Sequence, residues 1–137
     1  MQAAIKNSLK VIGLLGGSAV ALGALGAHAL KNQLVTGKIT ADQLAGFDTG
    51  VRYQMYHTLA MFLLLLLNQQ FPSLNFERAR RFFLWGIVLF SGSLYLLCTR
   101  GLSGIDFFRY LGPVTPVGGV LMVAGWLFLF VEGFKKS

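Results

Sequence analysis

Four long apolar stretches, separated by short polar segments, dominate this sequence and limit the folds open to it. They cover residues 10–31, 47–68, 82–99 and 116–134, and basic residues stand at or near their ends. About 20 apolar residues are needed for one helix to cross the hydrocarbon core of a bilayer. The pattern therefore predicts an all-α, integral membrane four-helix bundle that forms one domain over residues 1–137.

The composition agrees with a lipid environment. Hydrophobic residues make up 55% of the chain and charged residues 12%, whereas a soluble domain carries about 25% charged residues. The net charge of +7 would suit nucleic acid, but the basic residues flank apolar runs, so we expect no nucleic-acid partner. Cys98 lies inside such a run and is expected to pack in the core, and Trp85 and Trp126 are expected near the membrane interfaces. Zinc-type Cys and His spacings do not occur, so no metal site is expected.

The first apolar stretch has a second interpretation as a secretory signal peptide. Lys6 and Lys10 precede it, and Ala27-His28-Ala29 follows it in the manner of a cleavage site. Its apolar part is rich in Gly and Ala rather than in leucine, which suits helix packing in lipid better. We therefore expect it to remain as the first span.

The distribution of basic residues predicts the orientation in the membrane. With four spans, both termini and the middle loop share one side, and the side richer in Lys and Arg is normally cytoplasmic. Seven basic residues fall on the side of the termini and five on the other, which predicts N-in, C-in insertion in a bacterial inner membrane. The seven are Lys6, Lys10, Arg78, Arg80, Arg81, Lys135 and Lys136, and the five are Lys31, Lys38, Arg52, Arg100 and Arg109.

Two helix starts can be predicted from local sequence. Thr40-x-x-Gln43 has the spacing of a capping box, which predicts that the helix of the second span begins near Ala41. Thr115-Pro116 places an N-cap residue before a proline at the first helical position, which predicts a helix start there.

The first span carries its small residues on one side. Plotted at 100° per residue, they gather on one face, and Leu15, Leu22 and Leu25 lie broadly opposite. Small residues let helix backbones approach closely in lipid. We predict that this face packs against another helix through Gly13, Gly16, Gly17, Ala24 and Ala27.

The start of the second span is unusually polar for a helix in lipid. Asp48 and Arg52 are one turn apart in an order that suits an ion pair, while Tyr53 and His57 share another face. Polar groups are costly in hydrocarbon, so this end lies at the headgroups, is wrapped by helices, or lines a wet pocket. For a pocket near the outer face, the candidates are His28, Asp48, Arg52, Tyr53, Tyr56, His57 and Tyr95.

Four motifs, in order along most of the chain, resemble a known family. They are GALGAHAL (23–30), RYQMYHTLA (52–60), FSGSLY (90–95) and PVTPVGG (113–119). Together they are similar to the small bacterial inner-membrane proteins of the domain of unknown function 423 family and to the eukaryotic transmembrane protein 256 group. The resemblance implies a four-helix membrane protein and assigns neither a reaction nor catalytic residues.

Three classes of function remain open from the sequence. The favoured one is a structural or accessory membrane protein, or a subunit of a larger assembly, whose partner is another membrane protein or a second copy. A carrier or channel for a small solute or a proton is the alternative, although the polarity is confined to one side and an oligomer would be needed. Binding of haem through His28 and His57, of quinone or of lipid is the third. No catalytic motif occurs, so neither an enzyme nor a bound cofactor is expected.

The orientation can be tested with introduced cysteines. In a Cys98→Ala background, Thr36→Cys and Ser73→Cys variants should label from opposite sides of the membrane. In intact cells, a membrane-impermeant thiol reagent should reach position 36 and spare position 73. The reverse labelling would show that the orientation is wrong.

Overall fold

The computed structural model describes residues 2–135, and no β-strand occurs within that range. The chain is therefore all-helical there, as predicted. Lys136, one of the seven basic residues counted above, lies outside the described residues. The helices are α1 (Gln2–Leu25), η1 (Gly26–Leu30), α2 (Lys31–Val35), α3 (Ala41–Gln70), α4 (Glu77–Cys98), α5 (Arg100–Ser103), η2 (Asp106–Leu111) and α6 (Val114–Glu132).

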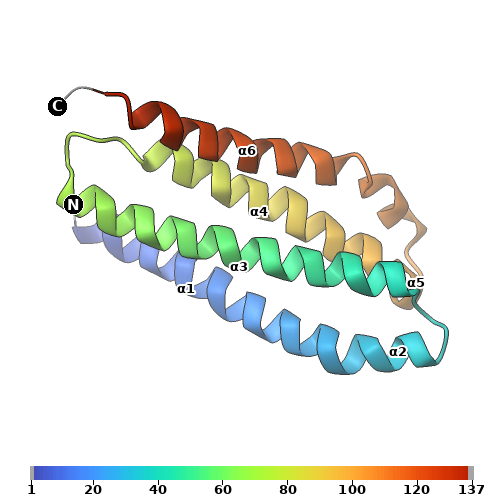
Figure 1. Cartoon of the computed structure of the whole chain (residues 1–137). Helices are drawn as coiled ribbons and strands as arrows, with labels where there is room; N and C mark the ends of the chain where they lie inside the picture. Colours follow the sequence, from blue (N-terminus) through green and yellow to red (C-terminus); the bar gives the residue numbers. More distant parts are fainter. Residues whose placement is uncertain (1, 136–137) are drawn as a thin grey trace.

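The four long helices lie side by side in the order α1, α3, α4, α6 (Figure 1). Each packs mainly on the long helix before or after it in the chain, and α1 and α6 stand at the two sides of the row. The start of α1, the α3–α4 connection and the end of α6 meet at one end, while α2 and α5 lie at the other. The long helices therefore run in alternating directions.

Among residues 2–135, three helical segments are long and apolar enough to cross a membrane. They are Gln2–Val35, which includes the π-helical turn η1, Glu77–Cys98, and Asp106–Glu132. The 30-residue helix α3 is not among them, because polar residues dilute its first half. It nevertheless lies between two of these segments, against α1 and α4.

The predicted start of α3 is confirmed, and that of α6 is wrong. The Thr40 hydroxyl accepts a hydrogen bond from the Gln43 backbone N–H at 3.2 Å, and the Gln43 side-chain oxygen accepts one from the Thr40 N–H at 2.8 Å. This reciprocal pair begins α3 at Ala41. In contrast, α6 begins at Val114, one residue before Thr115. Thr115 does not cap the helix because its hydroxyl forms a 2.6 Å hydrogen bond with Ser93 of α4.

The face of α1 that packs inside the chain differs from the predicted one. Gly13 and Gly17 are exposed, and a methyl group on either would have nothing within 4 Å outside its own helix. Ala24 and Ala27 are exposed as well. Of the three predicted glycines, only Gly16 approaches α3, where a methyl group would lie 3.7 Å from the Thr58 methyl group.

The opposite face of α1 packs on α3 instead. Ile12 and Ala19 are buried, and Leu15 and Leu22 pack against the two apolar clusters of the core. The spacing of small and large residues along α1 separates two apolar faces. It does not show which of the two faces packs on the neighbouring helix. Gln54 decides the matter, because its side chain binds the Leu15 carbonyl and the Ser18 hydroxyl and so sets the rotation of α1.

Glycines allow α4 and α6 to approach most closely. A methyl group on Gly118 would lie 2.3 Å from the backbone nitrogen of Phe90, and one on Gly125 would lie 2.5 Å from the Phe83 ring. On the α4 side, one on Gly86 would lie 2.6 Å from the Met122 side chain. These distances are too short for a carbon atom, so both helices need glycine at the contact.

Adjacent glycines provide a matched test of this contact. Gly118→Ala should lower the apparent Tm in detergent, by an amount equivalent to about 1–3 kcal/mol, because the new methyl group overpacks the backbone of Phe90. Gly119→Ala should not, because its methyl group would lie 3.7 Å from the Phe90 ring, an ordinary contact. Equal Tm losses in the two variants would contradict the close approach of α4 and α6.

Candidate functional site

Gln54 of α3 is buried and forms hydrogen bonds with two other helices, α1 and α4. Its side-chain nitrogen donates to the Leu15 carbonyl and to the Ser18 hydroxyl of α1, each at 2.8 Å. Its side-chain oxygen accepts from the Tyr95 hydroxyl of α4 at 2.7 Å. Because a carbonyl only accepts, the amide nitrogen must face Leu15, which leaves the oxygen for Tyr95. With Gln54 only 4% exposed, the amide is paired entirely within the chain.

His57 lies one turn away and links α3 to α6. Its Nδ1 is 2.8 Å from the Tyr53 carbonyl, and its Nε2 is 3.2 Å from the indole nitrogen of Trp126. The carbonyl only accepts and the indole N–H only donates. Nδ1 therefore carries the proton, Nε2 accepts, and the imidazole is neutral. The ring also packs edge-on against Phe83, with 5.1 Å between the ring centroids.

Two further hydrogen bonds connect the same helices. The Ser91 hydroxyl of α4 donates to the Gly50 carbonyl of α3 at 2.7 Å, and Ser93 pairs with Thr115 of α6. Together with Gln54 and His57, these contacts form what we call the central network. It comprises Ser18, Gln54, His57, Ser91, Ser93, Tyr95, Thr115 and Trp126.

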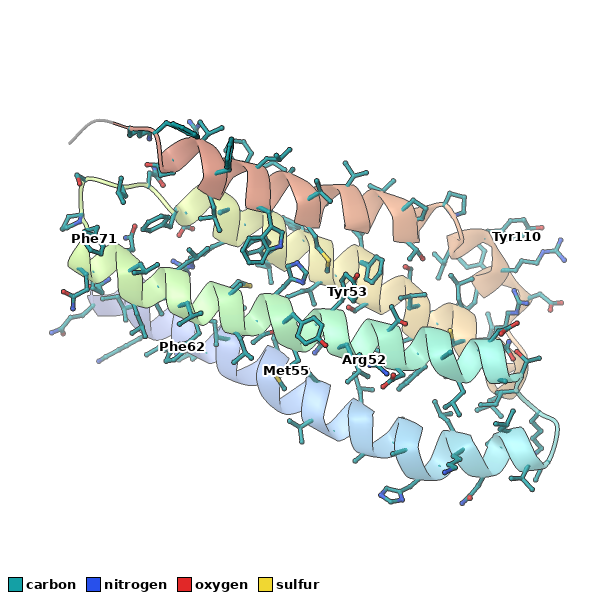
Figure 2. All side chains as sticks on the ribbon, in the orientation of Figure 1. Arg52, Tyr53, Met55, Phe62, Phe71 and Tyr110 are labelled. Atoms are coloured by element: carbon teal, nitrogen blue, oxygen red, sulfur yellow. The ribbon has the colours of Figure 1, made fainter. Side chains whose placement is uncertain are left out.

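The predicted outer pocket is not assembled, because its candidates lie in different places. His57 and Tyr95 belong to the central network. Asp48 and Arg52 form an exposed ion pair along α3, and His28 is exposed on η1. Figure 2 shows Arg52 and Tyr53 in the middle portion of α3, well separated from Tyr110 at one end and Phe71 at the other.

The two tyrosines of α3 lie on its surface. Tyr53 and Tyr56 are about half exposed, and the Tyr53 ring packs against Phe90 with 4.9 Å between the centroids. The side chains of residues 48–57 therefore separate into an exposed set and a buried set. Only the buried set meets polar groups of other helices.

Some residues of the central network were not predicted from sequence. Ser18, Ser91 and Trp126 were not recognised as partners of α3, and Trp126 was expected at an interface. The signal that could have found them was Gln54 itself, since an amide inside a membrane helix needs acceptors and donors from its neighbours. A single sequence does not tell which neighbouring hydroxyl or carbonyl will supply them.

The geometry is unfavourable for haem. An axial histidine needs a free ring nitrogen, and both nitrogens of His57 are already hydrogen-bonded. His28 is exposed on η1 instead of lying beside His57. Within residues 2–135, no three His, Cys, Asp or Glu side chains come together in a way that could hold a metal ion.

An open groove lies between the start of α3 and the segment formed by the end of α1, η1 and α2. It has a volume of about 360 Å³ and is lined mostly by small and apolar side chains, among them Gly23, Ala27 and Ala45. Lys31 and Asp48 are its charged lining residues. The central network takes no part in this lining.

These features define the class: a helical membrane protein whose buried polar side chains bind one another across helix interfaces. The chain belongs to the protein family of unknown function DUF423, whose model matches residues 22–119. It is therefore a membrane protein of a family without an assigned activity, as its motifs suggested.

Bacterial relatives extend this similarity over most of the chain. The chain is 38% identical over 137 residues to a UPF0382 membrane protein of Haemophilus influenzae, an alignment that covers 97% of this chain and 98% of the relative. It is 40% identical over 116 residues to the UPF0382 inner membrane protein YgdD of Escherichia coli, covering 85% and 80%. It is 38% identical over 118 residues to the UPF0382 membrane protein YwdK of Bacillus subtilis, covering 85% and 87%. No solved structure matches the chain.

The role of Gln54 can be tested against another glutamine of α3. Gln54→Ala should lower the apparent Tm by the equivalent of about 1–3 kcal/mol, because it leaves the partly buried Tyr95 hydroxyl without its acceptor. Gln69→Ala should change stability by less than about 0.5 kcal/mol, because this side chain is exposed.

A double-mutant cycle completes this test. Tyr95→Phe removes the other partner of the Gln54–Tyr95 hydrogen bond. Its effect should be smaller in the Gln54→Ala background than in the native chain. Strict additivity of the two effects would contradict a direct hydrogen bond.

Proposed function

We propose that this chain is a four-span protein of the bacterial inner membrane, inserted N-in and C-in as a single domain, with a structural or accessory role. The relative YgdD is itself named an inner membrane protein. The excess of basic residues at the end that holds the start of α1 supports a cytoplasmic position for that end.

The fourth span in this proposal is α3. It is 30 residues long, which corresponds to roughly 45 Å at 1.5 Å per residue and exceeds the thickness of the hydrocarbon core. Its polar first half disfavours a lone helix in lipid. Gln54 and His57, however, are buried against α1, α4 and α6, so their polarity is hidden from lipid.

The pairing inside the central network is the observation that carries the structural role. A transport path or a catalytic site needs polar groups that are free to bind a solute. Gln54 and His57 instead use their donors and acceptors on neighbouring helices. Such hydrogen bonds fix the positions of helices in lipid.

A contact with another chain follows from the face of α1 that remains exposed. Gly13, Gly17, Ala24 and their neighbour Ala21 are exposed on the side of α1 turned away from α3. We call this face the small-residue stripe. Close packing in lipid is driven by van der Waals contact between such faces, so the stripe suits a helix of a membrane-protein partner or of a second copy, in addition to lipid.

The test is whether a bulky residue on the small-residue stripe removes a partner. The tagged chain should co-purify with a second chain in native nanodiscs, and Gly17→Leu should abolish this association while leaving the apparent Tm of the chain unchanged. Gly92→Leu is the matched control, because a methyl group at Gly92 also has nothing within 4 Å.

The readout is native mass spectrometry of the purified nanodiscs. Loss of the second chain in Gly17→Leu and its retention in Gly92→Leu would support an accessory role through α1. A native chain that purifies alone and monomeric would contradict the proposed contact.

A further inference from the structure

Arg80, near the start of α4, is nearly buried for a charged residue and is not fully paired. Its side chain is 12% exposed, and its Nη1 donates to Glu77 at 3.0 Å. Its Nη2 donates to the Ser8 hydroxyl of α1 at 2.5 Å. The Nε group is buried and has no hydrogen-bond partner within residues 2–135. The guanidinium therefore keeps donor capacity that an added acceptor would satisfy.

A groove of about 200 Å³ runs beside this arginine, between α1 and α4. Its polar lining comes from the first two turns of these helices, and its apolar lining is Val11, Leu84 and, from α3, Met61. The groove therefore changes from polar to apolar along its length. The polar residues that line it are Asn7, Ser8, Glu77, Arg80 and Arg81.

A second groove, of about 360 Å³, lies on the α6 side of α4 and shares Arg81 with the first. It is lined by Arg81 and otherwise by Phe82, Trp85, Leu89 and Leu121. Arg81 thus belongs to both grooves, and its side chain is 72% exposed. Two grooves with apolar walls therefore meet at one cationic side chain, Arg81.

The local charge favours an anion at that point. Residues 2–10 and 77–81 hold five basic residues and one acidic residue, Glu77. Glu77 is shared between Arg80 and Arg81, at 3.0 and 3.2 Å. At the same end, Glu132 is occupied by Lys135 and by the backbone N–H of Asn75, at 2.8 and 2.6 Å. Arginine suits a phosphate because its planar fork presents several donors.

We propose that Arg80 and Arg81 bind the phosphate of an anionic two-chain phospholipid, whose acyl chains lie in the two grooves on either side of α4. The two arginines would bind the headgroup phosphate, and the apolar side chains of the grooves would contact the acyl chains. Ser8 and Asn7 add polar groups at the headgroup level. The site lies at the end of the molecule where Phe71 is labelled in Figure 2, and it does not depend on the accessory role proposed above.

Trp85 provides a direct probe, because it lines the second groove and the chain has only one other tryptophan. The Trp126→Phe variant of the full chain leaves Trp85 as the only indole. Its fluorescence is measured in phosphatidylcholine bilayers that contain a small fraction of brominated phosphatidylglycerol or, in parallel, of brominated phosphatidylcholine. Bromine on the acyl chain quenches the indole when the lipid occupies the groove.

Phosphatidylglycerol should quench Trp85 about threefold more effectively than phosphatidylcholine at equal fraction, as expected for an anionic headgroup beside arginines. Arg81→Gln should reduce this preference to about one, because it removes the charge common to both grooves. Arg109→Gln, which alters an exposed arginine at the opposite end, should keep it.

Two further experiments test alternatives to a lipid site at these arginines. The first tests general attraction of anionic lipid to the protein. In Trp85→Phe, the remaining Trp126 should be quenched equally by the two brominated lipids, and a preference for phosphatidylglycerol as large as that of Trp85 would overturn the proposal. The second tests binding of a free anion. Inorganic phosphate should not relieve the quenching of Trp85. If it does, the site binds a free anion and the lipid proposal fails.

Equal quenching of Trp85 by the two lipids in the unaltered arginine background would also overturn the proposal, whether or not Arg81→Gln folds. Since these bilayers contain no second protein, such a failure leaves the accessory role untouched.

Discussion

Hydrogen bonding in a medium without water governs the interior of this protein. A side-chain amide in hydrocarbon finds no solvent partner, so Gln54 must be surrounded by groups from other helices. The Leu15 carbonyl, the Ser18 hydroxyl and the Tyr95 hydroxyl satisfy it. Meeting this one requirement determines which face of α1 meets α3, where Tyr95 of α4 must lie, and which polar residue of α3 is turned away from lipid. The remaining contacts are arranged around it.

The two sides of the helix row are built by different means. Between α4 and α6, glycines bring backbones and rings together, and Gly118 touches the backbone of Phe90 so closely that no side chain fits. Between α1 and α3, larger apolar side chains pack together, and the polar contacts come from Gln54. In addition, the neutral His57 joins α3 to α6 across α4 through Trp126. Hydrogen bonds thus set the relative positions of the helices, while glycines and larger apolar side chains provide the close packing between them.

Sequence reasoning predicts here what depends on local patterns. The capping box at Thr40 and Gln43 involves residues three apart, and it forms as expected. The face of α1 that packs on α3 was not identified from sequence, because both faces of this helix are apolar and only the distant Gln54 distinguishes them. Thr115 was predicted wrongly as a cap for a similar reason: Ser93, 22 residues away in the chain, binds its hydroxyl. The sequence identifies the polar residues at the start of the second span. Which of them are buried and which are exposed depends on the tertiary structure.

The row arrangement of the helices has a consequence for how the protein is made. Each long helix packs mainly on the long helices next to it in the chain, so the important contacts connect segments that are synthesised one after another. Folds with such local contacts form quickly, because little loop entropy is lost before contacts form. Each long helix after α1 therefore finds the surface on which it packs already synthesised. When Gln54 is synthesised, its two acceptors on α1 are already present, and only Tyr95 of α4 is still to come. The time during which this amide lacks partners in lipid is therefore short.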